Sequence, residues 1–188
     1  MIHPSTQIRF INNQIGYGVF ALGLIPCGTV VWAPDALDQV FTPLQTESLP
    51  DAQRSLLEKY GFVRRDGSLM LYWDARRFMN HSCSPNTLIT NHGFEIAVKD
   101  IQQGDQLTCD YGALLPKRRF SCRCQDPECR GVIHPEDFMV CSSGWRQATE
   151  KALSLLNSVK QPLGDLIDRK PLLRDCSRAE RELVTLSA

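Results

Sequence analysis

The sequence predicts a mainly β fold with added helices, on three observations. Short apolar runs broken by glycine and proline fill the segment from Thr6 to Asp35, a pattern typical of consecutive short strands. Two further apolar runs, NTLIT and FEIAV, flank the turn-forming residues 91–93 and indicate a hairpin. Helical periodicity is confined to one internal segment and to the C-terminal part of the chain. We therefore expect one β body with helices added at two places.

The internal helix is expected at about 48–61, with Pro50 near its start and Gly61 just beyond its end. Its apolar face comprises Leu49, Ala52, Leu56, Leu57 and Tyr60. Extended segments should follow at Leu69–Trp73 and, after the Gly104 turn, at QLTCDY.

In the C-terminal part, Ser143 is the expected N-cap of an amphipathic helix. The apolar stripe of that helix comprises Trp145, Ala148, Ala152, Leu156 and Val159. A short final helix is expected beyond Pro171, because Ser177 and Glu180 have capping-box spacing.

Length and charge narrow the class of protein. A chain of 188 residues accommodates one main domain with a small appendage. Lysine plus arginine equals aspartate plus glutamate at 21 each, so the basic footprint of a phosphate-binding protein is missing and direct nucleic-acid binding is not predicted. The N-terminal segment does not resemble a signal peptide, and no apolar run reaches the length of a membrane span. We expect an intracellular protein, cytoplasmic or, in a eukaryote, nuclear, with no membrane partner; the oligomeric state is not predicted.

The cysteines indicate a metal site rather than disulfides. Eight are too few for a disulfide scaffold of this length, and without a secretion signal they should stay reduced. Cys122, Cys124 and Cys129 give three soft ligands within eight residues, and tetrahedral zinc requires a fourth. His134 or Cys141 could complete a purely local site. Because the surrounding segment is polar and loop-like, zinc would supply the order that an apolar core does not.

Three separated segments carry a specific resemblance. IGYGVFA (15–21), RFMNHSCSPN (77–86) and LTCDYG (107–112) occur in the order found in SET-domain proteins, a family of protein lysine methyltransferases, and CRCQDPECRG (122–131) resembles their post-SET zinc segment. The resemblance implies a SET domain at 6–115 with the knot-like β-clip fold, a post-SET segment at 116–134 and a C-terminal helical extension at 142–188. Protein chains rarely thread through their own loops, so this general rule would not predict a knot-like fold.

The resemblance also implies an S-adenosylmethionine site. Its glycine turn would let the backbone approach the cofactor and present an aromatic face, while the Asn-His pair would contact the methionine and adenine parts. Tyr60 and Phe120 are weaker candidates, and Asn86 is expected to be mainly structural. The implied cofactor-binding residues are Gly16, Tyr17, Gly18, Tyr60, Arg77, Asn80, His81 and Phe120. Cys83 is nominated as the fourth zinc ligand, so the expected metal set is Cys83, Cys122, Cys124 and Cys129.

Tyr111 is the implied catalytic residue, orienting the amine of a lysine presented by a protein substrate, for which a histone is one candidate. Cys109 occupies the position where related enzymes usually carry Phe or Tyr. Since cysteine is smaller than either, we expect the lysine channel, lined by Cys109 and Tyr111, to have room for more than one methyl group. Taken alone, each motif also fits an ordinary turn, core histidine or buried tyrosine. The alternative function is a cofactor-binding scaffold or interaction module without turnover.

Overall fold

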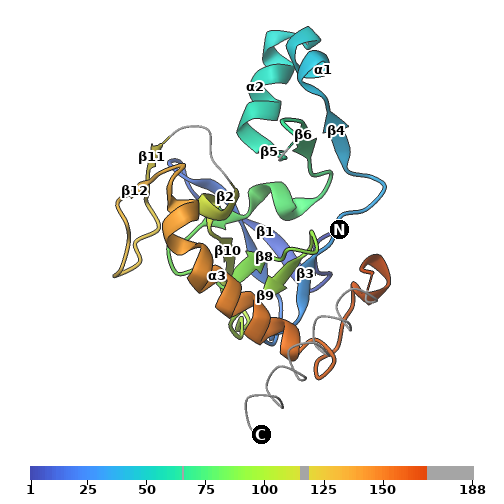
Figure 1. Cartoon of the computed structure of the whole chain (residues 1–188), viewed down its shortest axis with the longest axis vertical. Helices are drawn as coiled ribbons and strands as arrows, with labels where there is room; N and C mark the ends of the chain where they lie inside the picture. The colour runs from blue at the N-terminus through green and yellow to red at the C-terminus, as the bar shows by residue number, and fades with distance from the viewer. Residues whose placement is uncertain (65, 115–118, 169–188) are drawn as a thin grey trace, which may run out of the picture.

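The structure is a computed structural model, and it describes residues 1–64, 66–114 and 119–168 (Figure 1). Its body contains a four-stranded sheet in the order β1-β2-β10-β7 and a three-stranded sheet in the order β3-β9-β8. The first comprises β1 (Thr6–Asn12), β2 (Gly16–Ala21), β10 (Gln106–Cys109) and β7 (Asn80–His81). The second comprises β3 (Val30–Trp32), β9 (Glu95–Ala97) and β8 (Thr87–Ile89). The mainly β fold class is confirmed, as is the predicted hairpin, which is β8 and β9.

The inserted unit projects from this body at the top of Figure 1. It contains a third sheet in the order β4-β6-β5 and two helices. The strands are β4 (Gln39–Phe41), β6 (Leu69–Leu71) and β5 (Gly61–Val63), and the helices are α1 (Pro43–Ser48) and α2 (Asp51–Tyr60). Helix α2 is the predicted one, and Gly61 lies just beyond its end as expected. The prediction of a single inserted helix is wrong, because the unit contains two helices. The additional helix α1 begins at Pro43 behind a complete capping box formed by Thr42 and Gln45.

Helix α3 (Asp137–Ser154) crosses the body and packs against β8 and β9 (Figure 1). The expectation that Ser143 caps this helix is wrong, because the helix begins six residues earlier and Ser143 lies inside it. Ala152 and the following Leu156 and Leu163 complete an apolar cluster with Val30 and Ile96. The final helix expected beyond Pro171 lies outside the described residues.

A second apolar cluster lies behind the four-stranded sheet and includes Val19, Ala21, Leu107 and Cys109. The 3-10 helices η1 (Ala75–Phe78) and η2 (Tyr111–Leu114) pack against it. A two-stranded hairpin comprises β11 (Phe120–Ser121) and β12 (Val132–Ile133). A third 3-10 helix, η3 (Gly164–Leu166), follows α3. Within the described part of the chain, the helices are too short or too polar to cross a membrane.

Candidate functional site

The parallel pairing of β7 with β10 brings two of the sequence motifs together. Thr108 lies opposite Asn80, and Cys109 opposite His81. The next residue, Ser82, continues the contact by donating its backbone N–H to the Cys109 carbonyl at 3.0 Å. As a result, the Asn-His stretch and the strand that leads to Tyr111 lie side by side, although about thirty residues of sequence separate them.

Tyr111 lies at the start of η2, just beyond the end of β10. It contacts the Asn-His stretch through both its side chain and its backbone. Its hydroxyl donates to the Met79 carbonyl at 2.7 Å, and its backbone N–H donates to Nδ1 of His81 at 3.1 Å. Burial raises the pKa of the Tyr111 phenol, with the thiol of Cys109 adding to the effect. The phenol is therefore neutral at physiological pH and can donate or accept a hydrogen bond.

The glycine turn reaches the same place through Asn80, whose Nδ2 donates to the Tyr17 carbonyl at 3.0 Å. A Cβ on Gly18 would lie 2.8 Å from Cδ1 of Ile11 and 3.1 Å from Nδ2 of Asn80, so the contact requires glycine. Gly16 has a φ of +85° and open space where a Cβ would stand. The three predicted segments therefore meet, with open space beside Gly16, whereas Gly18 is buried.

Aromatic rings extend this site toward the inserted unit. Phe78 lies edge-on to Tyr17 at 5.8 Å between ring centroids and to Tyr60 at 5.6 Å. Tyr60, at the end of α2, thus joins the glycine turn through Phe78, a residue that the sequence analysis did not single out. Arg77 is exposed, with its guanidinium 5.1 Å from the Phe78 ring centroid.

On the other side, Phe120 of β11 lies 6.3 Å from the His81 ring and 6.0 Å from the Tyr111 ring. The predicted candidates Tyr17, Tyr60 and Phe120 are therefore all next to the Asn-His stretch or linked to it through one ring. Their arrangement offers flat, electron-rich faces, which suit a sulfonium cation or an adenine ring.

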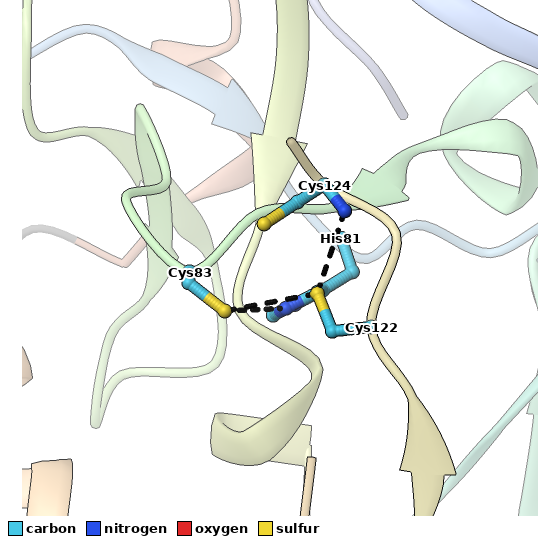
Figure 2. A group of neighbouring side chains, drawn as sticks. All are labelled: His81, Cys83, Cys122 and Cys124. Atoms are coloured by element: carbon cyan, nitrogen blue, oxygen red, sulfur yellow. Dashed lines mark hydrogen bonds between the residues drawn. The ribbon is translucent and has the colours of Figure 1, made fainter. Parts of the chain in front are cut away.

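A metal-binding group adjoins the same stretch. Figure 2 shows His81, Cys83, Cys122 and Cys124 gathered around one point, with their ligand atoms all within 4.8 Å of one another. The sulfurs of Cys83 and Cys122 are 3.7 Å apart. Two thiolates at about 2.3 Å from a tetrahedral zinc would be about 3.8 Å apart, so the observed spacing fits that ion.

Burial raises the pKa of the Cys83 and Cys122 thiols, whereas hydrogen bonds favour the thiolate form of Cys124. Burial opposes it, but backbone hydrogen bonds from Cys83 and Asp126 lower the pKa of Cys124 to about 7. Cys129 interacts with both Cys122 and Cys124 through its side chain but falls outside the four-residue group, where His81 takes the fourth place. The two local alternatives from the sequence, His134 and Cys141, are also outside the group.

Arg130 links the candidate metal-binding group to Asp110, which follows β10, and to α3. Its Nη2 lies 2.6 Å from Oδ1 of the buried Asp110, and its Nη1 lies 3.1 Å from Oδ2 of Asp137 at the start of α3. Its backbone N–H and its Nε each donate to the sulfur of Cys83 at 3.4 Å. Sequence reasoning missed Arg130 and Asp110, although both lie inside quoted motifs; only their distance in the fold reveals the pair.

Asn86 is structural, as expected: its amide donates to the Gln106 carbonyl at 2.9 Å and accepts from the Thr108 backbone at 2.9 Å. Cys109 is buried behind Tyr111, and burial raises the pKa of its thiol to about 12, so the side chain is a neutral, small wall.

A cavity of about 900 Å³ lies between the inserted unit, β8 and α3. Its lining includes Ala113 and Leu114 of η2, which follow Tyr111 directly, and Phe138 and Trp145 of α3. The cavity thus reaches the short helix that carries the candidate catalytic tyrosine, and its volume is in the range of ligand-binding pockets.

Comparison with known proteins agrees with these features. Residues 16–112, half of the chain, match the family model of the SET domain. The histone-lysine N-methyltransferase ash1 of Drosophila melanogaster is 39% identical over 140 residues, which is 66% of this chain and 6% of that protein. An H3 lysine-9 specific histone-lysine N-methyltransferase of Schizosaccharomyces pombe is 36% identical over 88 residues, 33% of this chain and 18% of that protein.

Among solved structures, the methyltransferase domain of human histone-lysine N-methyltransferase SETMAR matches with a TM-score of 0.49 and 20% identity, covering 71% of this chain and 58% of that one. The chain thus spans only a small part of the two curated relatives. The family-model match covers all three motif segments that converge at the site. The chain belongs to the SET-domain family.

Proposed function

We propose that this protein transfers methyl groups from S-adenosylmethionine to the side-chain amine of a lysine in a protein substrate. The observation that supports the proposal is a pair of hydrogen bonds that bring the three motif segments together: the Tyr111 hydroxyl donates to the Met79 carbonyl, and the Asn80 side chain donates to the Tyr17 carbonyl. When bound, S-adenosylmethionine supplies an activated methyl carbon on a sulfonium, so the protein needs only to present a neutral amine in line with it.

Presenting a neutral amine has a substantial cost. A free lysine has a pKa near 10.4, so its neutral form at pH 7 lies about 4 to 5 kcal/mol above the ammonium form. A channel with apolar walls disfavours the ammonium form and lowers that cost. Cys109, buried and neutral, would be one such wall, and the Tyr111 oxygen would orient the amine. The amine lone pair would then form the new N–C bond as the bond between the methyl carbon and sulfur breaks, which leaves a neutral thioether as the leaving group, and the extra proton on nitrogen would leave to water.

We assign cofactor binding to the Gly16–Gly18 turn, to Asn80 and His81, and to the rings of Tyr17, Tyr60 and Phe120, with Arg77 supporting the site. The open space at Gly16 and the ring faces around it support this assignment. The cavity beside η2 would receive the segment of substrate that carries the lysine.

We also propose that zinc is held by Cys83, Cys122, Cys124 and Cys129 and closes this side of the site. His81 fits poorly as the fourth ligand because its Nδ1 already accepts a hydrogen bond from the Tyr111 backbone. A neutral imidazole has one acceptor nitrogen, so Nε2 carries the proton and faces Cys83 at 3.3 Å as a donor. His81 would therefore support the Cys83 thiolate, and Cys129, already in contact with two of the thiols, would complete the tetrahedron.

A histone substrate is favoured by the names of the two relatives, both histone-lysine methyltransferases. If the source is eukaryotic, this substrate class supports a nuclear location. The smallness of Cys109 further predicts more than one methyl group per lysine, and strict monomethylation of a good substrate would contradict that part.

The decisive test combines cofactor binding with turnover. S-adenosylmethionine should bind the wild type in a calorimetric titration, and labelled cofactor should transfer methyl groups to lysines of core histones. Tyr111→Phe should keep cofactor binding but lose about 100-fold or more in rate, because it removes one oriented polar group at the reacting centre. Tight cofactor binding with no transfer to any lysine in a whole proteome would instead support the scaffold alternative.

A further inference from the structure

Arg76 is a charged side chain in the interior of the domain, only 4% exposed. It extends from η1 to Glu95 of β9, where its Nε lies 2.6 Å from Oε2, and Glu95 is itself fully buried. Thr87 donates to the other oxygen of Glu95 at 2.9 Å. The pair is neutral as a unit and hydrogen-bonded on several sides, so the guanidinium is held in one place.

That place is next to Cys109, the proposed wall of the lysine channel. Nη2 of Arg76 lies 3.8 Å from the sulfur of Cys109, and the guanidinium lies 5.0 Å from the centroid of the Tyr72 ring. Arg76, Tyr72 and Trp32 all line the cavity that begins at η2. The indole Nε1 of Trp32 is buried there without a hydrogen-bond partner among the described residues.

We infer that Arg76, positioned by Glu95, is a specificity-determining residue that limits the number of methyl groups added to the substrate lysine. The inference rests on the proposed function. Cys109 alone would leave a large space beside the amine, but the guanidinium, packed against the Cys109 sulfur, fills part of it. Each added methyl group increases the volume of the amine. Mono- and dimethyl-lysine therefore fit, and trimethyl-lysine is disfavoured.

The test replaces both partners, since removing one would leave a buried charge unpaired. Arg76→Met with Glu95→Met is compared with the wild type on core histones, and mono-, di- and trimethyl-lysine are quantified by mass spectrometry at equal extents of reaction. The trimethyl-to-dimethyl ratio should rise about threefold or more, with S-adenosylmethionine affinity unchanged. Arg54→Met, which removes an exposed arginine of α2, is the matched control and should leave the ratio unchanged.

A structural role alone would lower thermal stability without moving the product ratio, and that result overturns the inference. A wild type that already makes mainly trimethyl-lysine overturns it as well. If the double variant does not fold, Arg76→Lys decides: it keeps the charge but loses the planar guanidinium, so the trimethyl fraction should still rise, and an unchanged fraction counts against the inference. If the wild type binds cofactor but methylates no lysine, the proposed function itself is wrong. That result is distinct from a failure of the inference about Arg76.

Discussion

The four-stranded sheet and the β11–β12 hairpin border the same candidate site but are held by different forces. In the sheet, Val19 and Leu107 are fully buried in a continuous apolar cluster. Within residues 119–134, only Ile133 is buried. The hairpin instead depends on thiols, on Arg130 and on a few backbone hydrogen bonds such as Cys122 N–H to the Gly131 carbonyl at 2.8 Å.

The difference has a consequence for stability and for function. The sheet should fold without help because it buries apolar surface, whereas the hairpin should depend on its metal-binding group and its charges. The hairpin also carries Phe120, which contacts the rings of His81 and Tyr111. Loss of the hairpin should therefore disturb the candidate site while leaving the sheet intact.

Metal removal should cause the largest difference in stability between the hairpin and the sheet. Cys83→Ser removes one proposed thiolate, and structural zinc in small sites contributes on the order of 10 kcal/mol. Zinc content measured by mass spectrometry should fall from one per chain to well below that, and amides of 119–134 should lose protection in hydrogen exchange. Amides of β2 and β10 should stay protected.

Two matched variants sharpen that experiment. Cys27→Ser changes a cysteine outside the metal-binding group and should keep the zinc. Cys129→Ser tests the fourth ligand: it should lower zinc affinity if Cys129 completes the tetrahedron, and leave it unchanged if His81 does. Full zinc occupancy in Cys83→Ser would contradict the proposed site.

Leu107→Ala tests the opposite region. Leu107 is fully buried in the apolar cluster behind β10, so truncation should cost about 3 kcal/mol of unfolding free energy. Urea titration followed by circular dichroism measures the loss, and zinc stoichiometry of the folded protein should not change. Leu44→Ala, at a leucine that is 77% exposed, is the control and should change stability by less than about 0.5 kcal/mol. Equal losses in the two variants would mean that the sheet is not held by apolar burial.

The same division explains what the sequence could predict. The hairpin of β8 and β9 and the strand β10 were predicted because alternating apolar residues and turn residues are local signals. The meeting of the glycine turn, the Asn-His stretch and Tyr111 was predicted from their resemblance to a known family, since no local pattern places segments so far apart side by side.

What was missed depends on tertiary contact. Arg76 and Arg77 are neighbours in the sequence, yet Arg76 is buried against Glu95 and Arg77 is exposed. Nothing local distinguishes them. Helix α3 was expected to begin near Ser143, but its start lies at Asp137, where the carboxylate meets Arg130 from a different segment. Charge pairs of this kind become visible only when the chain is folded.

Arg130→Met should lower the free energy of unfolding by an intermediate amount. Asp110, which is 2% exposed, would lose its ion-pair partner, while Arg130 itself is partly exposed, so we expect a loss of about 2 kcal/mol. The variant should also bind zinc more weakly, because both side-chain hydrogen bonding to Cys83 and the link to Asp137 disappear. Calorimetric unfolding and zinc competition measure the two effects. Asp110→Asn in the Arg130→Met background should restore part of the stability; no restoration would mean that the unpaired carboxylate is not the cause.

The smallest loss of stability is expected for a change in α1 of the inserted unit. Helix α1 buries none of its residues. Thr42 Oγ1 accepts from the Gln45 backbone at 3.2 Å, and Gln45 Oε1 accepts from the Thr42 backbone at 2.8 Å. Thr42→Ala removes half of this capping box, which should cost about 1 kcal/mol, all of it local. Hydrogen exchange of residues 43–48 should quicken about fivefold while β2 and β10 are unaffected. Thr46→Ala, which keeps the cap and adds a good helix former, should not quicken exchange. If both variants behave alike, the cap does not hold α1, and the inserted unit depends on packing as the body does.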